Sequence, residues 1–351
     1  MTAKLYFLLD KKELFSGIGN MKTHKAIALF SGGLDSILAV KWMQNRGYLI
    51  HPIFFKAPYL FPERALDFAS QNNIELEIYD ISEEHIELLK NPIYGFGKRM
   101  NPCIDCHSLM FKKAAELLPS RNADYIISGE VLGQRPKSQR RDALNSVSKL
   151  SGIKDFIIRP LSQNLLPDTL PIREGWIDKK DMLSIHGRGR YAQMDLAKQL
   201  GVVNYPSPAG GCLLTDRNYC LRLADLQKYC QDDLHSIELL AKGRHFRLHK
   251  DAKLIIGRDD AENEWLKNIF QNGIMLEAEE YNGPTGFITG NVDADTLKLA
   301  LDIFILYYPK VQNNATINVW TVQDKKIVAK TTEIATKGNR EIINKYLISY
   351  T

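Results

Sequence analysis

The sequence has no apolar run that approaches the roughly 18 residues needed to span a membrane. Its first apolar stretch, LYFLL, is followed by Asp10, Lys11 and Lys12, so it lacks the apolar core of a secretory signal peptide. Cysteine is scarce, because the 351 residues include only five. This low, odd number argues against a disulfide framework and leaves reduced thiols for metal or sulfur chemistry. We therefore expect a cytoplasmic protein.

The composition lacks the bias of a disordered or fibrous chain, because 44% of the residues are hydrophobic, 25% are charged and 9% are aromatic. A length of 351 residues exceeds a typical domain of about 100 to 200 residues and predicts two domains. Lys and Arg (46) slightly outnumber Asp and Glu (41). The placement of the basic residues therefore matters more than the net charge of +5.

Apolar runs and amphipathic stretches alternate from residue 25 onward. Runs typical of buried strands occur at 26–30, 50–55, 74–81, 123–129 and 155–161, and a helix is expected at 34–46. This alternation predicts an α/β fold with a doubly wound, mainly parallel sheet, whose ligands bind beyond the carboxyl ends of the strands. We assign this catalytic domain to residues 21–231, after an N-terminal extension at 1–20. Shorter β-like runs and helical stretches near 261–271 and 294–307 predict a smaller α+β domain at 232–351.

A glycine loop, SGGLDS, follows the first expected strand and opens the first helix. Gly32 and Gly33 permit a tight turn, and the amide groups at the start of the helix form an anion site. No Lys follows the glycines, so the loop is not a Walker A motif. A plain turn, with Asp35 or Ser36 as a helix N-cap, is the alternative.

In this position SGGLDS resembles the PP-loop of the ATP pyrophosphatases, whose domain is adenine nucleotide alpha-hydrolase-like and whose members adenylate an oxygen and release pyrophosphate. The resemblance implies that ATP and Mg²⁺ bind here, with Asp35 near the metal ion. The residues expected to hold the nucleotide are Ser31, Gly32, Gly33, Asp35, Ser36 and, after the fourth strand, Gly129.

Three cysteines form the second motif, since NPCIDC supplies Cys103 and Cys106, and PSPAGGC supplies Cys212. With ADYIISGE downstream of the pair, this layout resembles the PP-loop tRNA thiolases, chiefly the 2-thiouridine and 4-thiouridine synthetases. The resemblance implies that Cys103 and Cys212 lie beside the activated base and that the three thiolates hold a 4Fe-4S cluster with one iron open for sulfide. A persulfide relay between Cys103 and Cys212, or a zinc site completed by His107, are the alternatives.

The remaining two cysteines lie in a helical stretch, NYCLRLADLQKYC. We expect Cys220 and Cys230 to be small buried residues without a chemical role.

Basic residues gather in three clusters, at 129–141, 186–190 and 242–250. Together they suggest a polyanionic partner, and RNA fits better than a small metabolite. Each cluster could alternatively be a solvated surface. The residues expected to contact RNA are Arg135, Lys137, Arg140, Arg141, Arg188, Arg190, Arg244 and Arg247.

In the second domain, GRHFRL, KLIIGRDDAENEWL and YNGPTGFITG are similar to the RNA-binding domain at the end of the NFACT ribosome-rescue proteins. The thiouridine synthetases carry other RNA-binding domains, so the chain departs from their pattern here. A dimerisation or lid domain is the alternative.

These features predict an ATP-dependent tRNA sulfurtransferase that adenylates a uridine carbonyl and replaces its oxygen with sulfur. Asp35, Cys103 and Cys212 are its expected catalytic residues. The expected partners are tRNA and a sulfur donor, either inorganic sulfide or a persulfide carrier. The alternatives are a sulfur insertase acting on a small molecule, and a non-enzymatic RNA-binding protein with ATP and cluster sites.

Overall fold

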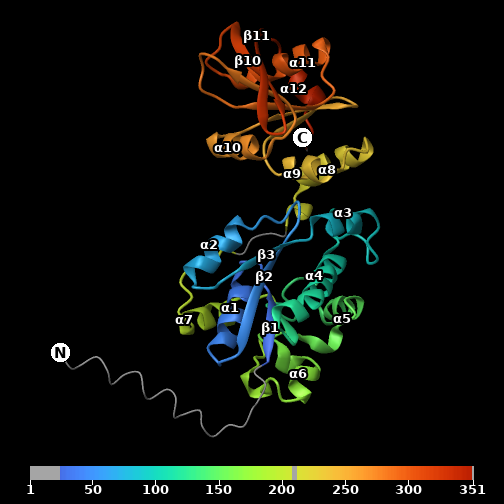
Figure 1. The fold of residues 1–351 in the computed structure, drawn as a ribbon, viewed down its shortest axis with the longest axis vertical. Helices are drawn as coiled ribbons and strands as arrows, with labels where there is room; N and C mark the ends of the chain where they lie inside the picture. The colour runs from blue at the N-terminus through green and yellow to red at the C-terminus, as the bar shows by residue number, and fades with distance from the viewer. Residues whose placement is uncertain (1–23, 208–211, 350–351) are drawn as a thin grey trace, which may run out of the picture. The chain divides into compact units, whose positions relative to one another are not determined.

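The computed structural model describes residues 24–207 and 212–349, so the predicted extension at 1–20 lies outside the described residues. The described chain forms two compact units (Figure 1). The first unit comprises 24–55, 62–79 and 107–206; the second comprises 56–61, 80–106, 207 and 212–349. Within the described residues no helix is both long and apolar enough to cross a membrane.

The second unit takes in two short segments from the first half of the chain. Ala57, Tyr59 and Leu89 share a buried apolar cluster with Tyr219 and Leu223. This packing joins residues more than a hundred positions apart, and no local pattern predicts it. The compact units therefore do not follow the proposed division near residue 231, which stays a prediction.

The first unit is built on a five-stranded sheet with the strand order β3-β2-β1-β4-β5. Strand β1 pairs in parallel with both β2 and β4, and β4 pairs in parallel with β5, which confirms the predicted α/β sheet. The strands are β1 (Lys25–Leu29), β2 (Leu49–Lys56), β3 (Glu77–Asp80), β4 (Tyr125–Ser128) and β5 (Ile157–Ile158). All four residues of β4 are buried, as an apolar central strand between two helical layers requires.

Helices lie on both sides of this sheet, with α1, α2 and α7 drawn on one side and α4 and α5 on the other (Figure 1). They are α1 (Leu34–Gln44), α2 (Glu63–Gln71), α4 (Cys103–Leu117), α5 (Arg141–Leu150), the short α6 (Leu170–Arg173) and α7 (Tyr191–Gln199). Because each βα connection returns the chain to the same edge, the loops after β1 and β4 meet at the carboxyl ends of the strands.

The second unit contains a six-stranded antiparallel sheet with the order β11-β10-β8-β9-β7-β6. Its strands are β6 (Arg244–His249), β7 (Ala252–Ile256), β8 (Gly273–Ala278), β9 (Gly286–Gly290), β10 (Asn314–Gln323) and β11 (Lys326–Thr336). Its helices are α3 (Ser82–Lys90), α8 (Arg217–Lys228), α9 (Leu234–Leu239), α10 (Asp260–Ile269), α11 (Ala294–Phe304) and α12 (Glu341–Tyr346). The antiparallel sheet with its helices confirms the predicted α+β fold of the C-terminal part of the chain.

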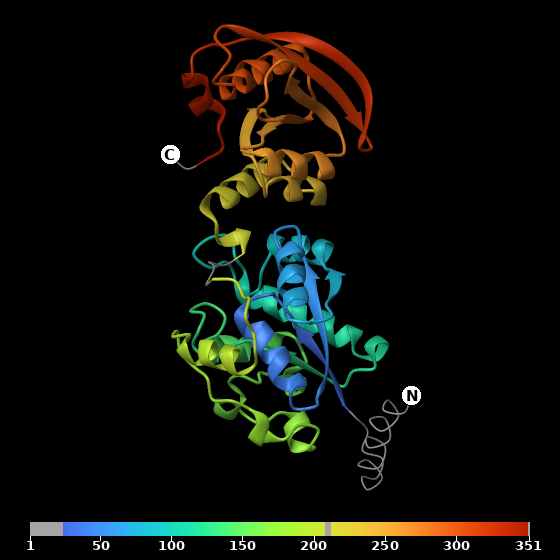
Figure 2. The same cartoon turned by 90° about the vertical axis from the view of Figure 1, so that its left-hand side faces the viewer.

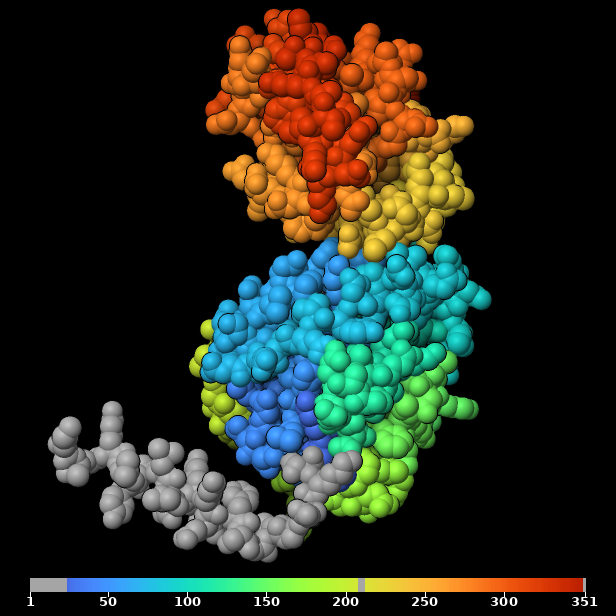
Figure 3. Space-filling view, viewed as in Figure 1, coloured from blue at the N-terminus to red at the C-terminus, as the bar shows by residue number. Residues whose placement is uncertain are grey.

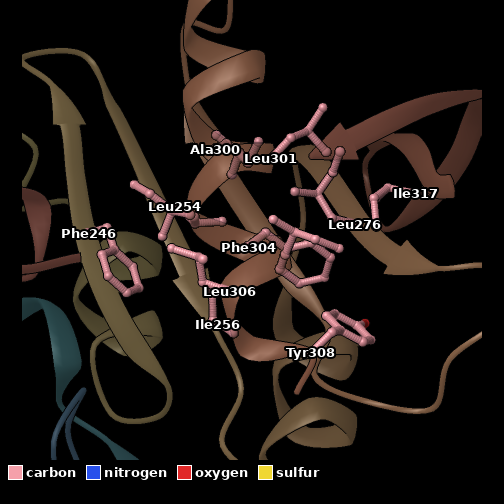
Figure 4. Close-up of a cluster of buried hydrophobic side chains, with 14 of the residues drawn as sticks. Phe246, Leu254, Ile256, Leu276, Ala300, Leu301, Phe304, Leu306, Tyr308 and Ile317 are labelled. Carbon is pink, nitrogen blue, oxygen red and sulfur yellow. The ribbon is translucent and has the colours of Figure 1, made fainter. Parts of the chain in front are cut away.

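Helix α11 supplies much of the core of this sheet. Its Phe304 and Leu301 pack among Leu254 and Leu276 from the strands, as Figure 4 shows. The long hairpin of β10 and β11 is drawn in red in Figure 2, and its atoms lie on the surface of the second unit in Figure 3. Consistently, every residue of β11 except Ala335 is exposed.

Candidate functional site

The glycine loop has the geometry of a phosphate cradle at the start of α1. Gly32 has φ +74°, and a Cβ at this position would lie 2.7 Å from the Cα of Ala65, so only glycine fits. Gly33 is the N-cap of α1 and has no side-chain capping bond. The alternative in which Asp35 or Ser36 caps the helix is therefore not what the structure shows. Instead, the Ser36 hydroxyl donates to the Gly33 carbonyl oxygen (2.8 Å) inside the loop.

Asp35 carries a carboxylate oxygen that the surrounding protein leaves unbonded. Its Oδ2 atom accepts a hydrogen bond of 2.6 Å from the Gln134 amide, and the Arg190 guanidinium lies 4.0 Å away. Its Oδ1 atom is buried and has no hydrogen-bond partner among the described residues. Burial raises the pKa of Asp35, although Arg190 and Gln134 oppose the shift. A buried, unpartnered carboxylate oxygen at a phosphate cradle fits a Mg²⁺ ligand.

Gly129 brings the end of β4 against the same loop. A Cβ at Gly129 would lie 2.5 Å from the Asp35 carbonyl oxygen and 2.6 Å from the Ser36 nitrogen. The structure therefore gathers all six residues expected to hold the nucleotide, since Gly129 contacts the loop that the other five form.

Glu130, which the sequence did not single out, is a buried anchor directly after Gly129. It forms an ion pair of 2.8 Å with Arg159, and its Oε1 atom lies 2.8 Å from His107 Nδ1. Burial alone would raise its pKa, but these two partners lower it to about 2. No local sequence signal marks this network, because Arg159 lies 29 positions further along the chain.

The three cysteines of interest all lie in the second unit. Cys103 and Cys106 begin α4, and Cys212 precedes α8. Burial raises the pKa of Cys106 well above its usual value, and the charges of Cys212 and Cys103 raise it further. Burial likewise raises the pKa of Cys212 to about 11, with a further contribution from Cys103. The three thiols therefore lie within electrostatic reach of one another, although 106 positions separate Cys106 from Cys212.

His85 is a second residue that the sequence analysis missed. This fully buried side chain places Nε2 2.9 Å from the Cys106 sulfur, and its Nδ1 is bonded to the Tyr59 hydroxyl. Burial lowers the pKa of His85 to about 4, so the ring is neutral at neutral pH. Cys103 has a different partner, because its sulfur accepts a hydrogen bond of 3.1 Å from the Asn101 amide.

The 4Fe-4S cluster on Cys103, Cys106 and Cys212 stays a prediction. Within residues 24–207 and 212–349, no group of three or more His, Cys, Asp or Glu side chains is placed to hold a metal ion. His107, the predicted fourth ligand of the zinc alternative, has its Nδ1 atom 2.8 Å from Glu130 Oε1.

The two remaining cysteines differ from each other. Cys220 is buried, as expected, and lies 3.2 Å from the Leu214 carbonyl oxygen. The prediction for Cys230 is wrong, because this residue is exposed. It follows the last residues of α8 with φ +54°, a left-handed turn that ends the helix and directs the residue to solvent.

The basic residues that were expected to contact RNA differ in their contacts within the protein. Arg140 pairs with the neighbouring Asp142, and Arg141 donates to the Leu165 carbonyl oxygen. In β6, Arg247 is a largely buried partner of Asp225 at 2.5 Å. Arg135 and Arg188 are exposed, and Lys137 is half-buried.

Arg244 is held by its own sheet. Its guanidinium donates to the Gly257 carbonyl oxygen (3.1 Å) and lies 4.9 Å from the centre of the Tyr307 ring. The basic cluster at 242–250 contains strand β6, which the sequence pattern did not predict. In this strand His245 and Phe246 are fully buried.

Two models of known protein families match parts of the chain. Residues 21–164 match the family described as thiamine biosynthesis protein (ThiI), and residues 243–347 match the NFACT protein RNA-binding domain. We call these two matched ranges the ThiI segment and the NFACT segment. This pairing confirms both predicted resemblances. The ThiI segment contains the glycine loop, Gly129 and two of the three cysteines, and the NFACT segment contains the antiparallel sheet.

Individual relatives match parts of the chain. A probable tRNA sulfurtransferase of Thermococcus kodakarensis is 28% identical over 166 residues, which cover 46% of this chain and 43% of the relative. A tRNA-specific 2-thiouridylase MnmA of Petrotoga mobilis is 30% identical over 226 residues, covering 57% and 58%. A 4-thiouridine synthetase solved with RNA and ATP aligns with a TM-score of 0.32 and 20% identity over 51% of this chain and 52% of that one. The chain thus spans about half the length of these relatives.

Proposed function

We propose that the chain is an ATP-dependent tRNA sulfurtransferase. The observation that carries the proposal is the unpartnered Asp35 oxygen at a glycine loop that tolerates no side chain at Gly32. A site of this kind suits ATP activation of an oxygen, and the ThiI segment surrounds it. The names of the relatives and the RNA-binding match of the NFACT segment support tRNA as the acceptor.

In the first step, the glycine loop and Gly129 hold the triphosphate of ATP. Asp35 Oδ1 would hold Mg²⁺, which would supply neutralisation of the phosphate charge. The carbonyl oxygen of the target uridine attacks the α-phosphorus, the bond to pyrophosphate breaks, and the base becomes adenylated. The protein contributes mainly positioning and charge stabilisation.

In the second step, we propose that sulfur reaches the activated carbon by the persulfide relay, which the different partners of Cys103 and Cys106 support. A terminal persulfide sulfur on Cys103 attacks the carbon, and AMP leaves with the former carbonyl oxygen. The Cys212 thiolate then attacks the Cys103 sulfur, which releases the thiocarbonyl and leaves a Cys103–Cys212 disulfide. A dithiol reductant then reduces the Cys103–Cys212 disulfide to two thiols, and a persulfide donor transfers a new terminal sulfur to Cys103. The 4Fe-4S cluster stays a prediction, and no step here depends on it.

The proposal is tested by incubating the protein with ATP, unmodified tRNA and a persulfide donor. We expect pyrophosphate release and a thionucleoside that is detectable by mass spectrometry after tRNA digestion. Asp35→Ala should abolish both products, whereas Asp195→Ala, which alters an exposed side chain on α7, should retain them. Pyrophosphate release by Asp35→Ala at the wild-type rate would contradict the assignment. Pyrophosphate release at the same rate with and without tRNA would favour the alternative of a sulfur insertase that acts on a small molecule.

A further inference from the structure

Two segments of the first unit form one continuous surface, which we call the loop pair: residues 131–141 and 184–191. The Gly187 amide donates to the Leu132 carbonyl oxygen (2.7 Å). Gly133 (φ +82°) and Gly187 (φ +87°) allow this approach, since a Cβ at Gly133 would lie 3.4 Å from the Gly187 nitrogen. The Ser162 hydroxyl joins both segments, as it accepts from the Leu132 amide (3.0 Å) and donates to the Ile185 carbonyl oxygen (2.6 Å).

A chain of side-chain hydrogen bonds ties the loop pair to the nucleotide loop. The fully buried Gln193 amide donates to Gln134 (2.6 Å), and Gln134 donates to Asp35 (2.6 Å). Arg190 approaches the same carboxylate at 4.0 Å. The first turn of α7 therefore has a defined position relative to Asp35.

Tyr191, the first residue of α7, is the most solvent-exposed large hydrophobic residue of the described chain, at 83% exposure. Exposed cations accompany it on the loop pair, namely Arg188 and Arg135. A hollow of about 390 Å³ adjoins the same helix, between His186, Ala192 and neighbouring residues. An exposed ring among cations is typical of surfaces that bind single-stranded nucleic acid, where bases stack on aromatic rings and cations contact phosphates.

We propose that Tyr191 is the stacking platform for an unpaired base of the RNA substrate, and that Arg188 and Arg135 contact the adjoining phosphates. This inference rests on the proposed function and deepens it, because it names the residue that holds the RNA next to the ATP site. The surface favours RNA over a protein partner, since the two exposed arginines of the loop pair supply the positive charge that phosphates require.

The test measures binding of fluorescent oligouridylate and of unmodified tRNA to the full chain. Tyr191→Ala should weaken binding about 5- to 100-fold without changing its salt dependence, while Tyr191→Phe should bind like the wild type because the ring is retained. Met194→Ala, on the same helix and 42% exposed, is the matched control. Arg188→Ala should instead reduce the slope of log affinity against log salt by about 0.7 to 1. Thermal unfolding checks that each variant is folded.

Equal affinities of Tyr191→Ala and Met194→Ala for both RNAs would overturn the inference. Normal RNA binding by Tyr191→Ala with impaired sulfur transfer from a protein persulfide carrier would also overturn it, because the surface would then belong to a protein partner. Failure of the proposed function is separately visible. If the wild-type protein binds RNA through Tyr191 but forms no thionucleoside, the stacking site is supported and the proposed sulfurtransferase activity is refuted.

Discussion

The imidazole Nε2 atom of His85 lies 2.9 Å from the sulfur of Cys106, and Tyr59 holds the opposite ring nitrogen. This contact separates Cys106 from Cys103, whose sulfur is bonded to Asn101 instead. The two cysteines of one CxxC motif thus have different partners. Such a division suits thiols with different roles better than three equivalent ligands of one cluster.

The first prediction concerns thiol reactivity. Cys106 and Cys212 should react with iodoacetamide slowly near pH 7, because burial raises the pKa of both thiols and the thiolate is the nucleophile. The exposed Cys230 is the internal reference and should be alkylated first. Mass spectrometry of timed digests measures the order. Labelling of all three at one rate would show that the enclosed environment of Cys106 and Cys212 does not persist in solution.

The second prediction separates the relay from the cluster. In the relay, iron-free protein supplied with a persulfide donor thiolates tRNA, and Cys106→Ala retains activity while Cys103→Ala and Cys212→Ala lose it. In the cluster reading, anaerobically reconstituted protein binds about four irons, and each of the three replacements loses both iron and activity. Iron content and thionucleoside yield, measured on the same samples, decide between them. Cys220→Ala, a buried cysteine outside the motif, is the control.

The sequence predicts those parts of the site that local pattern determines. The glycine loop could be placed between strand and helix because SGGLDS directly follows an apolar run. The partners of Glu130 and Cys106 could not be predicted, since Arg159 and His85 reach them only after the chain has folded. Buried charged residues give no periodic signal of their own.

Strand β6 shows a second limit of sequence reasoning. The segment RHFRLH reads as a basic cluster by composition, yet its arginines pair with Asp225 and the Gly257 carbonyl within the second unit. Charge counts cannot distinguish a cation that faces a partner molecule from one already paired inside the fold. The alternation of Phe246 and Leu248, both buried, was the available signal for a strand.

The third prediction tests the steric argument at the nucleotide loop. Gly32→Ala and Gly129→Ala should each weaken ATP binding at least tenfold, because the added Cβ would meet backbone atoms at 2.7 Å and 2.5 Å respectively. Gly189→Ala is the matched control, since nothing lies within 4 Å of a Cβ there and its φ is ordinary. Titration with a fluorescent ATP analogue measures the effect. Equal affinity of all three variants would show that the loop does not need its glycines to bind ATP.

The fourth prediction concerns the buried ion pairs of Glu130. Glu130→Gln should lower the free energy of unfolding by roughly 3 to 5 kcal/mol, because it leaves the buried Arg159 without a counter-charge. The exposed pair of Arg140 and Asp142 provides the control, and Asp142→Asn should be indistinguishable from the wild type. Urea unfolding at pH 7 compares the two. A small change in the free energy of unfolding of Glu130→Gln would mean that solvent or a structural rearrangement compensates for the lost counter-charge of Arg159.

The last prediction is a pH dependence that originates at Lys253. This lysine of β7 is almost fully buried, and its Nζ lies 3.6 Å from Asp225, which Arg247 also binds. Burial lowers the pKa of Lys253 to about 7, although Asp225 opposes the shift. The unfolded chain holds this proton up to about pH 10.4, so between those values it binds more protons than the folded chain. Stability should therefore rise with pH in that window, by at most about 1.4 kcal/mol per pH unit.

Lys253→Met removes this contribution and leaves the pair of Asp225 and Arg247 in place. We expect its free energy of unfolding at pH 7 to equal or exceed that of the wild type, and the difference between the two proteins to shrink as the pH rises from 7 to 10. For Lys250→Met, at an exposed position nearby, the free energy of unfolding should change with pH in the same way as that of the wild type. Urea unfolding followed by tryptophan fluorescence includes a signal from this unit, because Trp265 and Trp320 pack against its core. A constant difference between Lys253→Met and wild type across the window would show that Lys253 stays protonated in the folded protein, with Asp225 offsetting the cost of its burial.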